Sequence, residues 1–198
     1  MKPNVNMKNL FILSILLLPS LGIARNAHYN VGISTGLYAY NYQDDKGETE
    51  LESTTVPFTL FAEMETSRVN KVYIGLREFD LEVDATNSGN LGTNIESIQF
   101  EATWLRKFKM TRNFKPWFGV GIRSSLVETS LRHTVDRDGF LLETFNNTDN
   151  TFLALVLKTT ADWEIGEGWY INADASVDQP IGDGLQGFGF SLGIKYEL

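Results

Sequence analysis

Large apolar side chains occupy every second position over long stretches of the chain, with small or polar residues between them. The last stretch, FGFSLGIKYEL at 188–198, keeps this pattern throughout. A period of two is that of a β-strand with one apolar face. The alternation predicts eight strands, at 29–42, 56–65, 72–83, 95–108, 117–131, 152–164, 170–178 and 187–198.

The third predicted strand changes phase part-way along its length. Its apolar residues fall on even positions from 72 to 76 and on odd positions from 79 to 83. A β-bulge adds one residue to a strand and so shifts its alternation. We therefore expect a bulge at Arg77-Glu78.

The links between the predicted strands alternate in length. The short links are 67–70, 109–116 and 165–168, the longer polar ones are 43–55, 84–94 and 132–150, and the last link at 180–186 is short. Even strand number with short turns at one end and long loops at the other is typical of outer-membrane barrels. Backbone groups in hydrocarbon must all be paired, so the last strand must pair with the first.

A soluble barrel also alternates, but its polar face meets water and is rich in charged residues. Here the polar face is rich in Gly, Ser, Thr and Asn, which suits a narrow interior. Aromatic residues gather near strand ends, as in a membrane-interface girdle. They are Trp104, Phe108, Trp117, Phe118, Trp163, Trp169 and Tyr196. The sequence therefore predicts an all-β fold: an eight-stranded antiparallel up-and-down transmembrane β-barrel with short periplasmic turns and longer extracellular loops.

The first 24 residues have the features of a secretory signal peptide. Lys2 and Lys8 precede an apolar run at 10–18 that is too short to span a bilayer as a helix. Small residues lead up to Ala24, the favoured cleavage position, and Ala27 is the alternative. We expect 1–24 to be a cleaved signal peptide, or less readily a retained anchor, and 25–198 to be one barrel domain.

Charge narrows the classes of partner. The 25 acidic and 17 basic residues give a net charge of −8, and loss of the two signal-peptide lysines makes it about −10. This balance argues against a nucleic-acid partner. The chain has no cysteine, so neither disulfides nor a lipoprotein anchor are expected.

The signal, the eight alternating segments and the last strand together resemble the small Gram-negative outer-membrane barrels of the OmpA transmembrane-domain and OmpX type. The resemblance implies an outer-membrane location, contact with outer-membrane lipids and lipopolysaccharide, and a monomer. It also implies that the last strand is read by the barrel assembly machinery, usually through a terminal Phe or Trp where this chain has Leu198. The residues concerned are Phe190, Leu192, Ile194, Tyr196 and Leu198.

The polar parity of the strands carries charges of both signs. Those predicted at middle depths are Arg77, Glu101, Arg123, Lys158 and Asp174. With eight strands the interior is filled by side chains, so we expect an ion-pair network there and no wide pore. The alternative for these residues is a gated ion path or a proton-linked switch in a narrow channel.

An enzyme is the other alternative. Lipid A deacylases and palmitoyltransferases share this architecture and need a His, a Ser and an acid at the outer rim. His28 lies at the periplasmic start of the barrel, and strict alternation puts His133 on the face opposite Glu128 and Ser130. We therefore expect no catalytic residue, cofactor or metal, and predict a structural or surface-interaction role in membrane integrity or adhesion.

Two outer loops and one turn have a marked charge. The loops at 43–52 and 136–150 are acidic, and the second also carries Phe140, Leu141, Leu142 and Phe145. They are open to three interpretations: solvated loops, divalent bridging to lipopolysaccharide phosphates, or contact with a host or partner surface. The second periplasmic turn is basic, which suits an interface anchor or contact with inner-leaflet phosphates or periplasmic polymers. Its basic residues are Arg106, Lys107, Lys109, Arg112 and Lys115.

Overall fold

The computed structural model describes residues 28–43, 50–86, 91–108, 115–182 and 184–198, and the regular elements within them are strands. The predicted signal peptide at 1–24 lies outside these ranges. Among the described residues, no helix is long and apolar enough to cross a membrane. The strands are β1 (His28–Gln43), β2 (Glu50–Thr55), β3 (Phe58–Ser67), β4 (Asn70–Val83), β5 (Gly92–Lys107), β6 (Lys115–Val135), β7 (Leu141–Thr144), β8 (Thr148–Gly166), β9 (Trp169–Pro180) and β10 (Leu185–Glu197).

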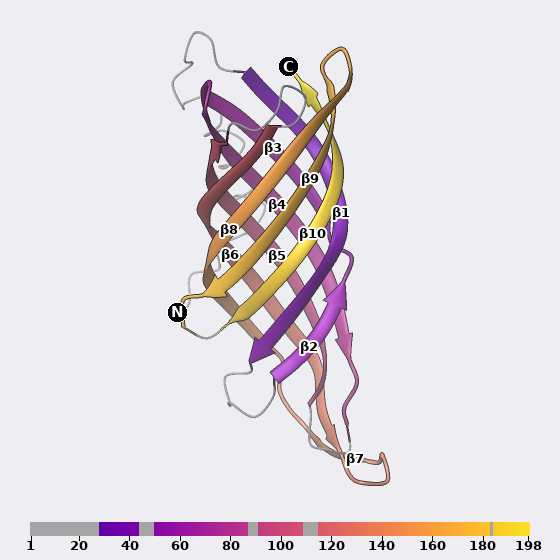
Figure 1. The fold of residues 1–198 in the computed structure, drawn as a ribbon. Coiled ribbons are helices and arrows are strands. Elements are labelled where there is room, and N and C mark those ends of the chain that lie inside the picture. The colour runs from indigo at the N-terminus through magenta and orange to yellow at the C-terminus, as the bar shows by residue number, and fades with distance from the viewer. Residues whose placement is uncertain (1–27, 44–49, 87–90, 109–114, 183) are drawn as a thin grey trace.

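Eight of these strands close into an antiparallel barrel, as predicted (Figure 1). Each barrel strand pairs with its neighbours in chain order, and β10 returns to pair with β1 from Asn30↔Glu197 to Tyr42↔Leu185. The amide of Leu198 extends this seam by donating to the carbonyl of Tyr29 at 2.8 Å. Closure leaves the barrel without an exposed sheet edge, which is the condition for spanning hydrocarbon.

The predicted loop at 43–55 contains a strand. Residues 50–55 form β2, which pairs with the far end of β1 from Tyr38↔Thr55 to Gln43↔Glu50. The register continues into β3 without a shift, so β2 and β3 act as one strand interrupted at Val56-Pro57. Proline has no N–H for the ladder, which accounts for the break.

The predicted loop at 132–150 also contains regular structure. β6 runs on to Val135, β7 pairs with it, and β8 begins at Thr148. This hairpin of β6 and β7 projects from the end of the barrel opposite the C-terminus (Figure 1). The strands thus extend beyond the segment lengths that the apolar alternation indicated.

The prediction of a bulge at Arg77-Glu78 was wrong. β4 pairs with β5 in unbroken register from Asn70↔Arg106 to Val83↔Thr93, and odd positions of β4 face inward throughout 71–81. The apolar residues change sides instead, so Phe79 and Leu81 are buried inside the barrel. The barrel wall keeps one phase while its apolar parity switches from the outer face to the inner face.

An irregularity occurs in β6 instead. Asn94 pairs with Ser130 but Gly92 pairs with His133, so β6 has one extra residue there. Leu131, which lies in this interval, has a backbone φ of 53°. This left-handed conformation is rare for residues other than glycine. This is the geometry of a β-bulge near the outer rim.

The outward face between the two rims is apolar. Large side chains are exposed on every strand of the barrel except β4, whose Val72, Ile74 and Leu76 are half-buried. Exposed aromatic residues near the periplasmic rim are Trp104, Phe108, Phe118, Trp163, Trp169 and Tyr196. Trp117 was expected among them, but its side chain points into the lumen and is buried. An exposed apolar belt with aromatic residues at its edge is the surface of a membrane-spanning barrel.

Candidate functional site

The lumen is filled by charged side chains in equal numbers of each sign among the described residues of the spanning region. The buried cations are Lys71, Arg77, Arg123, Lys158 and Lys195, and the buried acids are Glu63, Glu101, Asp162, Asp174 and Asp178. A buried charge without a partner is costly. Ion pairs and hydrogen bonds divide these residues into two groups, each with zero net charge.

The first group is centred on Glu101, on β5. Arg123 Nη2 lies 2.5 Å from Glu101 Oε2, and Lys158 Nζ lies 3.2 Å from Glu101 Oε1. Arg123 also donates to Asp178, and Lys158 Nζ lies 3.4 Å from Asp174 Oδ1. Four of the five residues predicted at middle depth are therefore brought together here, joined by Asp178.

Arg77, the fifth predicted residue, reaches this group through a hydroxyl. Its guanidinium donates to the hydroxyls of Tyr38 at 2.6 Å and Tyr40 at 3.3 Å, and to Thr59 Oγ1 at 3.3 Å. The hydroxyl of Tyr38 in turn donates to Asp174 Oδ1 at 3.3 Å. Arg77 also lies over the Tyr38 ring, 3.7 Å from its centroid. We call these six residues (Arg77, Glu101, Arg123, Lys158, Asp174 and Asp178) the central cluster.

The second group, here the periplasmic cluster, consists of Glu63, Lys71, Asp162 and Lys195. Glu63 accepts from Lys71 and Lys195, both at 2.5 Å, and Lys195 Nζ lies 2.9 Å from Asp162 Oδ1. Lys71 was missed from the sequence because the predicted strand began one residue later. Extending the alternation back from Tyr73, which also faces inward, would have found it.

An aromatic layer separates the two clusters. It is made by Phe61, Tyr73, Leu105 and Trp117, all buried. Lys158 of the central cluster lies 4.0 Å from the Tyr73 ring centroid, and Lys71 of the periplasmic cluster lies 4.7 Å from the Trp117 ring centroid. Cation–π contact thus joins this layer to the charges on either side.

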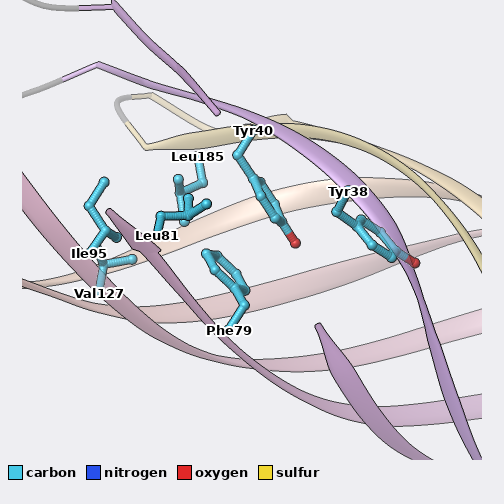
Figure 2. Packing of buried hydrophobic residues seen from close by; sticks show 7 residues of the cluster. All are labelled: Tyr38, Tyr40, Phe79, Leu81, Ile95, Val127 and Leu185. Atoms are coloured by element: carbon cyan, nitrogen blue, oxygen red, sulfur yellow. The ribbon is translucent and has the colours of Figure 1, made fainter. Parts of the chain in front are cut away.

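A larger apolar cluster fills the lumen towards the outer rim (Figure 2). Its members are Tyr38, Tyr40, Phe79, Leu81, Ile95, Val127 and Leu185. The rings of Tyr40 and Phe79 stack with centroids 4.5 Å apart. Gly189 lies directly opposite Tyr38 in the sheet, and a Cβ there would come 1.9 Å from Tyr38 Cδ1, so the ring needs glycine as its neighbour.

The outward face at this level carries a row of acids. Asp80 pairs with Glu96, Glu96 with Glu128, and Glu128 with Asp149, and all four side chains are exposed. Like charges directly opposite one another destabilise a sheet. Within the described residues no group of three or more His, Cys, Asp or Glu side chains is arranged to hold a metal ion. The row is therefore an acidic surface above the apolar belt.

The β6–β7 hairpin ends in an ordered turn with an apolar tip. Asp136 Oδ1 accepts from the amides of Asp138 and Phe140, both at 2.9 Å, and Gly139 has a φ of 84° that favours glycine. Phe140, Leu141 and Leu142 follow with exposures of 71%, 63% and 70%. Hydrogen bonds thus fix a turn that presents three large apolar side chains to solvent.

The two histidines lie at opposite ends of the barrel. His28 Nδ1 is 2.7 Å from Glu197 Oε1 across the closing seam. His133 was expected on the face opposite Ser130, but the bulge puts it on the same face, because their partners Gly92 and Asn94 are two apart on β5. His133 Nδ1 lies 2.7 Å from the carbonyl of Leu131, in its own strand.

No protein-family model matches the chain, and no curated protein matches it either. Solved structures do. Neisserial surface protein A (NspA) matches with a TM-score of 0.60 at 11% identity, over 87% of this chain and 99% of that chain. OprG, an outer membrane protein from Pseudomonas aeruginosa, has a TM-score of 0.59 at 11% identity, with 87% and 95% covered. Ail, the attachment invasion locus protein of Yersinia pestis, has a TM-score of 0.54 at 12% identity, with 86% and 99% covered.

The fold is that of a small outer-membrane barrel. This agrees with the resemblance drawn from the sequence and with the apolar belt of the structure. The residues predicted as an assembly signal, Phe190, Leu192, Ile194, Tyr196 and Leu198, all lie exposed on the outward parity of the last strand or directly after it. They border the closing seam with β1, because Phe190, Leu192, Ile194 and Tyr196 pair directly with that strand.

Proposed function

We propose that this chain is a non-catalytic, monomeric outer-membrane protein that strengthens the membrane and contacts a partner through its outer end. The observation that carries the proposal is the ordered β6–β7 tip with Phe140, Leu141 and Leu142 exposed. A contiguous exposed apolar patch is characteristic of an interaction site. The filled lumen supports a wall that is rigid enough to hold this hairpin away from the membrane.

The partner surface should be apolar with a basic rim. Asp136, Asp138 and Glu143 surround the tip in sequence, and the acidic row lies below it on the barrel wall. Ail has been solved with the heparin analogue sucrose octasulfate. The acidic outer end of this chain favours a different, cationic partner, and direct contact with lipopolysaccharide phosphates would need bridging cations.

Adhesion of bacteria expressing the full chain tests the surface role. The triple variant Phe140→Ser, Leu141→Ser, Leu142→Ser should lose most binding to host-cell monolayers. Ile165→Ser is the matched control, because Ile165 is also exposed but lies in the β8–β9 turn at the other end of the barrel. Equal adhesion of both variants and the parent would refute the role of the tip.

The filled lumen favours a plug over a channel. Among the described residues, the side chains of the periplasmic cluster, the aromatic layer, the central cluster and the outer apolar cluster fill the lumen, which supports this preference. We expect no resolved single-channel steps in planar bilayers and no change in the mass of lipid A incubated with the protein. A lipid A mass shift that His133→Ala abolishes would contradict the non-catalytic proposal.

Assembly partners follow from the last strand. We propose that the barrel assembly machinery reads the exposed row from Phe190 to Leu198, with Leu198 in place of the usual terminal aromatic residue. Leu198→Phe should therefore raise the yield of heat-modifiable barrel in the outer membrane. A lower yield for Leu198→Phe than for the parent would contradict this assignment.

A further inference from the structure

The lipid-facing wall of the barrel carries a groove. A groove of about 620 Å³ crosses β5, β6, β8 and β9 and reaches β10. Its walls are large exposed side chains, chiefly Trp104, Phe108, Phe118, Leu157, Val177 and Phe188. Its size is within the range of small-molecule binding sites.

The groove exists because small residues meet in register between larger ones. Thr159 pairs with Ala175, and both lie one step from the Leu157↔Val177 pair along the outward face. Phe118 flanks Thr159 on β6, and Phe190 flanks Ala175 on β10. The floor is therefore low between the long side chains of Phe118 on one side and Phe190 on the other.

The groove runs obliquely from the periplasmic rim into the apolar belt. Its upper wall is one cross-strand row in which Trp104, Val120, Leu157, Val177 and Phe188 pair in succession. Trp104 lies close to the periplasmic end of β5, whereas Phe188 lies in the half of β10 towards the outer loops. The offset arises because strands in a barrel are tilted and staggered. A chain that entered at the rim would follow the groove towards the bilayer centre.

A cation stands at the rim end of the groove. Arg106 is on the outward parity of β5, exposed, and directly opposite Phe118. Lys158 also borders the groove, but its ammonium points inward to Glu101 and Asp174. Of the two cations that line the groove, Arg106 is therefore the one available to an anionic group, and a guanidinium binds phosphate through paired hydrogen bonds.

We propose that this groove is a binding site for one anionic phospholipid of the periplasmic leaflet. Its acyl chain lies over Thr159 and Ala175, and its phosphate binds Arg106. The apolar walls and the Arg106 guanidinium at the rim match the two halves of such a lipid. The proposal requires only that the barrel spans the membrane, and it is independent of the outer-end function.

Native mass spectrometry of the refolded full barrel, titrated with phosphatidylglycerol or phosphatidylcholine in detergent, tests the proposal. The parent should retain one phosphatidylglycerol in preference to phosphatidylcholine. Ala175→Phe and Thr159→Leu should each remove most of the adduct by filling the floor. Arg106→Gln should weaken it about tenfold, because a hydrogen-bonded charge contact is lost.

Two controls match these variants. Ala62→Phe adds the same bulk to a lipid-facing alanine on β3, and Arg68→Gln removes an exposed arginine from the β3–β4 turn. Both should retain the lipid as the parent does, and heat-modifiable migration shows which variants are folded. Equal retention by the folded site variants and the controls would overturn the proposal, as would an adduct insensitive to Arg106→Gln.

Discussion

The membrane-spanning half of the barrel and its outer end are built with opposite polarity. In the spanning half, apolar residues such as Ile122 and Leu155 face out and the charge clusters lie inside. At the outer end Ile95 and Phe79 face in, while Glu96 and Glu128 face out. β4 runs through both regions in unbroken register and without changing phase. The surroundings alone therefore decide which parity is apolar: lipid around one region and water around the other.

Each region has its own source of stability. The spanning half depends on charge pairing among buried side chains in the lumen, whereas the outer end has an apolar core like that of a soluble barrel. Substitutions of the same kind should therefore have different effects in the two regions.

The largest effect should come from the central cluster. Arg123→Met leaves Glu101 and Asp178 short of a partner and should lower the free energy of unfolding by about 3–5 kcal/mol. Urea unfolding in lipid vesicles, followed by tryptophan fluorescence, measures it. Adding Asp178→Asn should recover part of the loss, and an additive double variant would mean that the two residues are not coupled.

An isoleucine-to-alanine pair compares the two regions directly. Ile95→Ala opens a cavity in the outer apolar cluster and should cost about 2–5 kcal/mol. Ile122→Ala, on the lipid face, should cost roughly half as much because lipid fills the space and the cavity term is absent. The same unfolding assay serves both, and a costlier Ile122→Ala would reverse our assignment of the two faces.

Charge on the outward face gives the converse comparison along β8. Leu155→Arg should cost about 2–4 kcal/mol in lipid, whereas Thr151→Arg, closer to the outer rim, should cost about 0–1 kcal/mol. Vesicle unfolding free energies of the two variants would measure the difference. Equal costs would place both positions at the same membrane depth and would contradict the boundary between the lipid-facing belt and the outer end.

The acidic row should give the smallest effect. Glu96→Gln removes a carboxylate that lies opposite both Asp80 and Glu128, so it should stabilise the barrel by up to about 1 kcal/mol at low salt. The gain should vanish near 1 M salt because the repulsion is screened. A gain that persists at high salt would have a cause other than charge.

The alternation of the sequence was sufficient to predict the closed barrel, the strand order and the inward parity of Arg77, Glu101, Arg123, Lys158 and Asp174. It failed where the apolar parity reversed, because a phase change in the pattern has two physical causes, a bulge or a change of surroundings. Phe79 and Leu81 illustrate the second cause. The β6 bulge at Leu131 left no signal in the alternation, and Trp117 resembled an interface aromatic until its parity was fixed by pairing with Lys107.

The ion pairs between lumen side chains could not be predicted from the sequence for a related reason. Alternation gives the face of each residue, but the pairing of Glu63 with Lys195 depends on which strands meet across the barrel and at what stagger. Lys71 was not predicted to face the lumen only because the predicted strand began one residue after it, at position 72. The groove beside Arg106 likewise depends on cross-strand register.

Single-cysteine spin labelling along β4 tests the reversal of polarity most directly, since the chain has no cysteine of its own. Labels at Ile74, Leu76, Phe79, Asp80 and Glu82 would be compared for collisions with oxygen, which concentrates in lipid, and with a water-soluble nickel chelate. We predict that positions 74 and 76 collide with oxygen, positions 80 and 82 with the chelate, and position 79 with neither. If the label at position 79 instead collided with oxygen, Phe79 would face lipid. That result would favour a bulge at Arg77-Glu78 and contradict the reversal of polarity.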